Sequence, residues 1–445
     1  MWSVRKILEC PSCGAKFPPF PPRLSCDACG SPLIPRIIDL RLKDVHRKIN
    51  YGGIWVFKDF LISGGKSEVT LGEGLTPLIK AVRLGEYLGL SNVLIKDESR
   101  NPLGTFIDRG SATLMSVALN LRFKKVVVAS LGDLGISISA YARKAKIKSY
   151  VVMPHSITPS KAYQVLVLAD KVEFTSSYEE AIRKVLKIKD SLQVTPLNPY
   201  LLDGYRTIYY EIYSELGKHP DVLIVPMGDG ALMTALWYAL KDLGGKSMII
   251  GVKGCSSTPL LKDISVEKPL YERVIKDILQ DSGGFIVEVC DKDVIEAIKL
   301  LASSEGLLIE PVGVSSIAGL MKLSINDELP SNKLVVTLIT GGALRDASIL
   351  RLLTDKHIMQ EEGLKIGFTK LKILEILVSQ GPLHPYAIWK ILRDNYGIKI
   401  SLRVLYQHIE ELERLGLIKI NSYERVGGRV RKIYEVTSKG VKLLR

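Results

Sequence analysis

The sequence lacks any apolar run long enough to cross a membrane. Although 47% of its 445 residues are hydrophobic, its longest apolar stretches, such as residues 126–130 and 335–339, have the length of a strand. A membrane-spanning helix needs about 20 apolar residues. The first ten residues, MWSVRKILEC, also lack the apolar core of a secretory signal. We therefore expect a soluble, cytoplasmic protein with no membrane partner.

Cysteine is scarce, but its spacing is informative. Four of the six cysteines form two C-x-x-C pairs, Cys10, Cys13, Cys26 and Cys29. In a reducing compartment this spacing predicts a metal site rather than disulfides, and four thiolates suit a structural, tetrahedral zinc ion. Four prolines between the pairs exclude a helix, so we expect a loop-built knuckle over residues 1–40. Cys255 and Cys290 stand alone, and we expect ordinary buried residues there.

Positive charge is in excess and is concentrated at one end. The chain has 61 Lys and Arg against 47 Asp and Glu, a formal net charge of +14. Residues 365–445 alone contain 16 basic and 7 acidic residues. Basic charge that is concentrated in one segment favours a segment that binds nucleic acid over a basic surface that is only solvated.

The middle of the chain alternates short apolar segments with amphipathic ones. Strands are expected at 93–96, 126–130, 149–153, 171–174, 222–226, 248–252 and 334–339, and helices at 136–145, 178–190 and 292–303. This alternation predicts an α/β body over residues 41–355 with parallel sheets. Three glycine-containing turns, at 130–135, 227–231 and 340–343, each follow a strand and are expected to precede a helix. Such turns can hold an anion with their backbone N–H groups.

Several ordered motifs resemble the threonine synthases and their relatives, the fold-type-II pyridoxal-phosphate enzymes. LGEGLTPL at 71–78 resembles that family's L-G-E-G-x-T-P-L. KDE at 96–98, followed by NPLGTFIDRG at 101–110, resembles its K-x-E-x-x-N-P-T-G-S-F-K-D-R-G. The resemblance covers roughly residues 1–350, and the N-terminal cysteine ribbon also occurs in archaeal-type members. It implies a two-lobed fold like that of the tryptophan synthase β subunit and a pocket for pyridoxal phosphate.

The positions that differ from that family are those that carry its chemistry. Ile107 stands where the resemblance implies the lysine that forms the Schiff base, and a branched hydrocarbon has neither a nucleophile nor a proton to transfer. Asp133 replaces an asparagine that bonds the cofactor's phenolic oxygen, and Asp229 lies in the phosphate-binding turn. At about 5 Å and an effective dielectric near 20, each pair of like charges there costs roughly 3 kcal/mol. Thr340, which matches a family hydroxyl that contacts the pyridine nitrogen of the cofactor, is retained.

These positions define an expected cofactor or effector pocket. Its residues are Ile107, Gly132, Asp133, Gly228, Asp229, Gly230, Ala231 and Thr340. No catalytic residue is assigned, and pyridoxal phosphate is expected to bind at most without a covalent bond. Lys96 and Lys161 both have counterparts in active relatives, so neither looks like a replacement for the missing lysine, although a relocated lysine stays open.

The C-terminal segment, 356–445, has the plan of a winged helix-turn-helix. Helices are expected around 371–377, 386–395 and 402–415, followed by strands at 418–422 and 432–437. SLRVLYQH at 401–408, LERLGL at 412–417 and RVRKIY at 429–434 resemble the PadR family of regulators. The resemblance implies a third helix that enters the major groove of double-stranded DNA.

The expected DNA contacts come from the start of the third helix and from the wing. Ser401 caps the helix, and its first exposed turns carry Arg403, Tyr406 and Gln407. The wing carries Arg425, Arg429, Arg431 and Lys432, which can reach phosphates. A winged helix can also dock on another protein, and this alternative stays open.

Three functions fit the sequence. The first is a transcription regulator, expected to be a homodimer, whose catalytically inactive body binds a small-molecule effector such as an amino acid or a related metabolite. The second is an active lyase of the threonine-synthase type with a regulatory DNA-binding tail. The third is a scaffold without a ligand, in which the body only sets the spacing of the DNA-binding arms.

Overall fold

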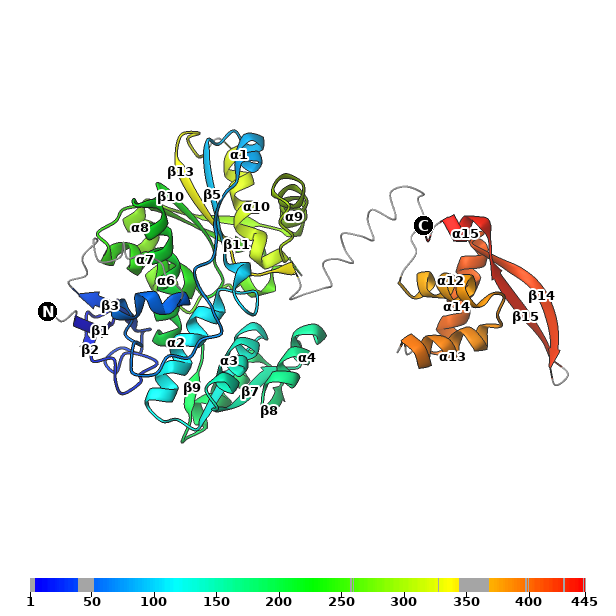
Figure 1. The fold of residues 1–445 in the computed structure, drawn as a ribbon, viewed down its shortest axis with the longest axis horizontal. Helices are drawn as coiled ribbons and strands as arrows, with labels where there is room; N and C mark the ends of the chain where they lie inside the picture. The colour runs from blue at the N-terminus through cyan, green and yellow to red at the C-terminus, as the bar shows by residue number, and fades with distance from the viewer. Residues whose placement is uncertain are drawn as a thin grey trace. The chain divides into compact units, whose positions relative to one another are not determined.

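The chain folds into two compact units, residues 1–349 and 350–445. The computed structural model describes residues 5–38, 52–343 and 368–444, except 257, 259, 327, 397, 399, 427, 428 and 443. Figure 1 shows the elements of each unit along the chain. Within the described residues no helix has both the length and the apolarity that a membrane crossing requires.

The N-terminal segment forms a small antiparallel sheet. Strand β1 (Arg5–Glu9) pairs with β2 (Lys16–Phe17) on one side and with β3 (Ile34–Ile38) on the other. The expectation of a knuckle built only from loops was therefore wrong, because the proline-rich stretch ends before β3 and leaves the flanking residues free to pair. Leu8 and Ile34 are fully buried in the core of the first unit, and β3 packs on α6 and α7.

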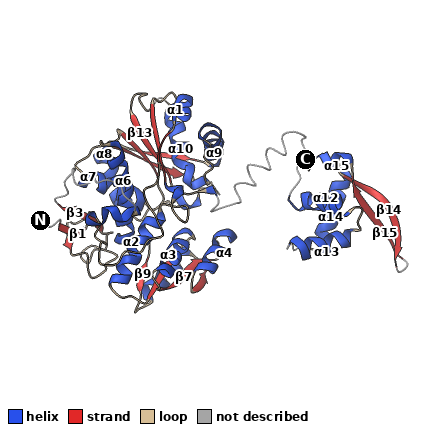
Figure 2. Ribbon diagram, in the orientation of Figure 1, coloured by secondary structure: helices blue, strands red, loops and turns tan. Residues whose placement is uncertain are grey.

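A six-stranded sheet forms the larger lobe of this first unit. Its strand order is β12-β11-β10-β13-β5-β4, and all neighbours are parallel except the edge pair β4 and β5. The strands are β4 (Leu78–Lys80), β5 (Asn92–Asp97), β10 (Val222–Pro226), β11 (Met248–Gly254), β12 (Ile286–Val289) and β13 (Leu334–Ile339). The surrounding helices are α1 (Val82–Leu88), α7 (Ala231–Asp242), α8 (Glu272–Ser282), α9 (Asp291–Glu305) and α10 (Pro311–Ile325). Figure 2 shows these helices around the strands.

A four-stranded parallel sheet of order β8-β7-β6-β9 forms the smaller lobe. Its strands are β6 (Lys125–Ala129), β7 (Lys148–Pro154), β8 (Lys171–Thr175) and β9 (Leu192–Val194). Helices α3 (Asp133–Lys144) and α5 (Tyr178–Lys187) pack on the strands, and α4 (Pro159–Leu168) packs on α3. Alternation of strand and helix thus produces two sheets, each mostly or wholly parallel, as the sequence predicts.

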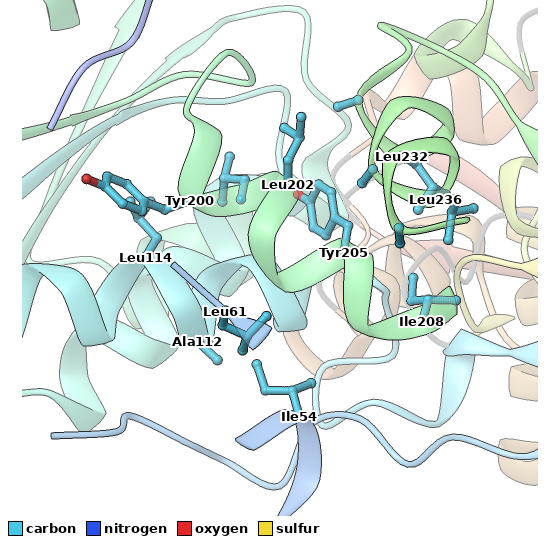
Figure 3. Packing of buried hydrophobic residues seen from close by; sticks show 14 of the residues in the cluster. Ile54, Leu61, Ala112, Leu114, Tyr200, Leu202, Tyr205, Ile208, Leu232 and Leu236 are labelled. Atoms are coloured by element: carbon cyan, nitrogen blue, oxygen red, sulfur yellow. The ribbon is translucent and has the colours of Figure 1, made fainter. Parts of the chain in front are cut away.

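Two long buried helices, α2 (Ile107–Asn120) and α6 (Pro199–Leu216), form the centre of the unit. Figure 3 shows side chains of α6, including Leu202 and Tyr205, packed between those of α2 and those of α7. Inside this packing Arg109 is fully buried and forms ion pairs with Glu98 at 2.6 Å and with Glu211 at 2.5 Å. A buried charge needs such partners, so this network fixes the first turn of α2.

The second unit is a winged helix. Helices α12 (Phe368–Gln380), α13 (Pro385–Tyr396) and α14 (Leu402–Arg414) precede the antiparallel pair β14 (Ile418–Val426) and β15 (Arg429–Val436) and a short α15 (Ser438–Lys442). Their buried side chains form a separate core that includes Leu374, Ile388, Leu405 and Ile409. The three helices and the hairpin agree with the elements predicted from the sequence.

Candidate functional site

Ile107 lies where the loop after β5 enters α2. Its half-buried side chain lines a cavity of about 560 Å³, a size typical of small-molecule sites. The loop is held beside the end of β13, because Phe106 N–H donates to the Thr340 carbonyl at 3.3 Å and Thr105 pairs with Gly341. Ile107 and Thr340 are thereby brought to one cavity from positions far apart in the sequence.

The turn between β6 and α3 supplies Asp133. Before it, Gly132 has a φ of 123°, and a Cβ there would lie 2.7 Å from Lys161 Cδ. The Ser130 hydroxyl accepts hydrogen bonds from the backbone N–H groups of Gly132 and Gly135, both at 2.8 Å. Two donors of this turn are therefore already satisfied within the protein.

Lys161 of α4 is buried beside the cavity between two carboxylates. Its ammonium lies 3.1 Å from Asp133 and 3.0 Å from Asp263. Burial alone would lower the pKa of Lys161, but Asp133, Asp263 and Glu310 outweigh it and hold this pKa above its ordinary value. A lysine held protonated in this way is a poor nucleophile.

Asp229 occupies the turn between β10 and α7. Gly230 precedes the helix with a φ of 91°, and Asp229 Oδ1 accepts a hydrogen bond from Ala231 N–H at 2.9 Å. Burial raises the pKa of Asp229, and the backbone hydrogen bonds offset part of that rise. The side chain of Asp229 thus takes a donor that the first turn of α7 would otherwise offer to a bound anion.

The cavity gathers most of the residues predicted for it. Its lining includes Ile107, Asp133, Gly228, Asp229, Gly230, Ala231 and Thr340. Gly132 is buried behind them, covered by Lys161, and is not part of the lining. The helix expected after residues 340–343 lies outside the described residues.

Other lining residues were not identified from the sequence. Four are charged, Glu179, Asp263, Lys268 and Glu310, and three are aromatic, Phe106, Tyr178 and Tyr205. Phe106 shares the motif at 101–110 with Ile107, whereas the others come from separate loops and helix starts. The proline that follows Glu310, a residue type common at the first position of a helix, is a weak signal for Glu310 at the start of α10.

The four paired cysteines converge on one point. The sulfur atoms of Cys10, Cys13, Cys26 and Cys29 all lie within 4.8 Å of one another. Individual separations are 3.4 Å between Cys10 and Cys29 and 3.6 Å between Cys13 and Cys26. Zn–S bonds of about 2.3 Å in a tetrahedron place the sulfurs about 3.8 Å apart. The cluster could therefore hold a zinc ion.

The two remaining cysteines are not isolated. Cys255 follows β11, Cys290 follows β12, and their sulfurs are joined in a disulfide. The expectation of two ordinary buried residues was wrong, because adjacent parallel strands end side by side and bring residues 35 positions apart together. Both side chains are only half-buried.

In the second unit, α14 presents polar side chains at its first turns. Ser401 caps the helix by accepting a hydrogen bond from Val404 N–H at 3.3 Å. Arg403, Tyr406 and Gln407 are exposed on the side of α14 away from the buried Leu405 and Ile409. The later turns carry Glu410, Glu411 and Glu413 instead. Only the start of the helix is therefore free of negative charge.

The wing adds basic side chains. Arg431 and Lys432 on β15 are exposed, whereas the side chains of Arg425 and Arg429 lie outside the described residues. On the inner side of the unit, Lys370 of α12 pairs with Glu411 at 2.5 Å and so links α12 to α14. Arg431 and Lys432 thus leave part of the wing positively charged.

Comparisons with known proteins agree with both halves of this description. Residues 69–341 match the family described as "Pyridoxal-phosphate dependent enzyme", and residues 373–445 match the "Transcriptional regulator PadR-like family". A threonine synthase of Synechocystis sp. is 30% identical over 322 residues, which cover 66% of this chain and 83% of that protein. One of Methanocaldococcus jannaschii is 29% identical, covering 66% of this chain and 81% of that protein.

Solved structures show the same fold at low identity. An L-serine ammonia-lyase from Rhizomucor miehei gives a TM-score of 0.55 at 20% identity, covering 65% of this chain and 99% of that one. Threonine deaminase isoform 2 from Solanum lycopersicum gives 0.52 at 23% identity, covering 63% and 87%. The chain therefore belongs to the pyridoxal-phosphate dependent enzyme family, with a threonine synthase-like body fused to a C-terminal PadR-like winged helix.

Proposed function

We propose that the chain is a DNA-binding transcription regulator whose body binds a small-molecule effector and performs no catalysis. The observation that carries this proposal is the pairing of a PadR-like winged helix with a pocket that has Ile107 where the resemblance implies a lysine. An effector can change the affinity for DNA only if it binds more tightly to one arrangement of the DNA-binding arms than to another.

The start of α14 is the proposed reading surface. Arg403 and Gln407 are long, exposed donors suited to base edges in the major groove, and Tyr406 lies between them in sequence. Glu410 and Glu413 on the later turns would be repelled by phosphates, so the helix would enter the groove by its N-terminal end. Arg425, Arg429, Arg431 and Lys432 on the wing would contact the backbone of the DNA and position the domain.

The loss of covalent chemistry is inferred from the amines near the pocket. Ile107 offers none, and Lys161 is held protonated by Asp133 and Asp263. Lys96 is fully buried in ion pairs with Glu211 and Glu215 and does not line the cavity. Lys268 does line it but is exposed, on the segment that leads to α8.

The residues of the pocket do not fit pyridoxal phosphate as an ordinary cofactor. Asp229 would compete with its phosphate for the N–H of Ala231 and would repel a dianion. Ser130 already holds two N–H groups of the other turn, and Asp133 places a carboxylate at the start of α3.

Two further features belong to the proposal. The cysteine cluster would hold structural zinc, since four thiolates leave no open coordination position for catalysis. A homodimer would give two reading helices and match a palindromic operator, as is common for such domains.

DNA footprinting with the purified full-length chain tests this function. The DNA would be the region upstream of the chain's own gene, with and without a panel of amino acids. The proposal expects a discrete protected site whose occupancy changes with at least one of the compounds. Uniform, salt-sensitive protection of all DNA would contradict specific regulation.

The second candidate is a pyridoxal-phosphate lyase with a regulatory tail. Its support is the 30% identity to a threonine synthase and the retained cavity with Thr340 in its lining. It requires a lysine at a position other than 107 to form the covalent bond with the cofactor. Lys268 is the lysine that lines the cavity.

A further inference from the structure

We propose that the cavity binds a small organic ammonium ion that carries no phosphate group. This inference deepens the proposed function by naming the chemical class of the effector. Binding itself requires only the first unit's cavity, so it can be tested without DNA. The supporting observations are the balance of charge in the lining, the state of the two helix starts and the aromatic walls.

Negative side chains dominate the lining. Five carboxylates line the cavity, Asp133, Glu179, Asp229, Asp263 and Glu310, against one lining cation, Lys268. Lys161 lies beside the cavity and neutralises part of this charge through Asp133 and Asp263. The lining therefore retains more negative than positive charge, which attracts cations and repels anions.

Asp229 is the carboxylate best placed to receive a cation. Its Oδ1 accepts from Ala231 N–H, and no basic side chain among the described residues pairs with it. Tyr178 and Tyr205 line the cavity together with Asp229, and the backbone N–H of Tyr271 donates to the Asp229 carbonyl at 3.0 Å; none of these side chains carries a positive charge. A bound ammonium ion would supply the missing counter-charge and offset the cost of burying this carboxylate.

Two of the three turns that could hold an anion already use backbone donors within the protein. At the start of α3 the Ser130 hydroxyl takes the N–H groups of Gly132 and Gly135, and Asp133 adds a negative charge. At the start of α7 Asp229 takes the N–H of Ala231. A phosphate would have to displace these acceptors and then face the carboxylates, so a ligand without phosphate is favoured.

The walls suit an ammonium ion with an apolar body. Phe106 and Tyr205 pack edge to face with ring centroids 4.9 Å apart, and both line the cavity together with Tyr178. Aromatic faces attract cations, and the lining also includes Ile107, Leu134 and Leu232. The side chain of Ile107 thus contributes apolar surface to the wall of the cavity.

Calorimetric titration of the full-length chain with three matched compounds tests the proposal. The compounds are 2-phenylethylamine, 2-phenylethanol and 2-phenylethyl phosphate, which share one ring and chain and differ in the head group. We expect the amine to bind at least about tenfold more tightly than the alcohol, equivalent to about 1.4 kcal/mol, and the phosphate not to bind. Equal affinities, a preference for the phosphate or no binding of the amine would overturn the proposal.

Variants locate the binding site and separate it from folding. Asp229→Asn should weaken amine binding by about tenfold and leave alcohol binding unchanged. Glu179→Gln, on the exposed start of α5, should weaken it less and serves if Asp229→Asn does not fold. Asp277→Asn changes an exposed carboxylate of α8 outside the cavity and should have no effect. Equal losses in all three variants would contradict the site.

Ligand binding and DNA binding can be tested separately, so either proposal can be rejected without the other. Each titrated sample would also be measured for DNA affinity by fluorescence anisotropy. If the chain binds the amine but no DNA, the regulator is rejected and the proposed class of ligand stands. If it binds DNA but not the amine, the proposed class of ligand is rejected and the DNA-binding proposal stands.

Discussion

Ile107 and Asp229 line the same cavity and bear on two different functions that it could have. Ile107 places a hydrocarbon side chain at the start of α2, and Asp229 places a carboxylate at the start of α7. The first change concerns bond formation and the second concerns anion binding. Restoring only one of them should therefore not restore the binding of an aldehyde that also carries a phosphate.

We therefore expect changes at residues 107 and 229 to be non-additive. Ile107→Lys alone should give no visible Schiff-base absorption band with added pyridoxal phosphate, because Asp229 still opposes the phosphate. Ile107→Lys combined with Asp229→Gly should give the band, which sodium borohydride would abolish. Ile107→Met combined with Asp229→Gly is the matched control without an amine. A full band in the Ile107→Lys single variant would show that Asp229 is not an obstacle.

Asp229 also predicts a dependence of stability on pH. Its pKa in the folded state is raised above the unfolded value, so its ionised form costs stability at pH values above that raised pKa. The cost is relieved as the pH falls towards the unfolded value. Asp229→Asn should therefore raise the melting temperature at pH 8 relative to the parent chain, and the gain should shrink at pH 5.

Thermal unfolding of both chains at the two pH values measures this difference. The Asp277→Asn variant, changed at an exposed position, should show no such trend. A gain that is the same at both pH values would mean that titration of Asp229 is not its cause.

At the residue scale, sequence motifs located several residues that line the cavity but missed most of its charged residues. Ile107, Asp133, Asp229 and Thr340 were found because each lies in a short motif of the middle region. Some of the other lining residues, such as Asp263 and Lys268, come from segments without a motif, and only the fold brings them to the cavity. The Cys255 and Cys290 pairing was missed for the same reason, since strand order is not visible in the spacing of two cysteines.

At the scale of elements, α14 is divided into two parts of different charge. Arg403 lies in the first turn, and the glutamates lie in the later turns. Arg403→Ala should cost about 1 to 3 kcal/mol of DNA binding and relax the preference at one base pair, if the arginine reads a base. Arg414→Ala, at the other end of the helix, should change the affinity much less. Anisotropy with the footprinted site and its single-base variants measures both.

The result for Arg403 can also reassign its role. An equal loss of affinity on all sequences, with a shallower dependence on salt, would place Arg403 on a phosphate. Unchanged DNA affinity would instead favour a protein-docking role for the winged helix.

Long apolar elements were the easiest to predict. The strands at 222–226 and 334–339 match β10 and β13 in full, because each is an apolar run, buried over nearly all of its length, that follows a charged residue. The short β4 and β9 and the partly exposed β12 were missed, since three or four residues carry too little pattern. The prolines at 18–22 led to a prediction of loops for the ribbon, although its strands lie on either side of this stretch and β3 itself contains Pro35.

At the scale of the molecule, the ribbon is part of the first unit. Arg36 of β3 bridges Glu9 of β1 and Asp242 of α7, both at 2.8 Å, and the Tyr200 hydroxyl donates to the Pro19 carbonyl. A metal that orders the ribbon should therefore also stabilise α6 and α7.

Metal removal tests this coupling. Treatment with a strong chelator should lower the melting temperature of the first unit, and zinc should restore it. Cys13→Ser should have the same effect and make the chain insensitive to the chelator. A melting temperature that chelation leaves unchanged, in a sample shown to have lost its zinc, would mean that the cysteines do not stabilise the body.

The account as a whole depends on the absence of a covalent bond between the body and an aldehyde cofactor. The most direct measurement is to incubate the full-length chain with pyridoxal phosphate, reduce it with borohydride and locate any modified lysine by mass spectrometry. We predict no stoichiometric modification of any lysine, including Lys161 and Lys268. A single lysine modified in full, together with a visible Schiff-base band before reduction, would contradict the account and favour the lyase.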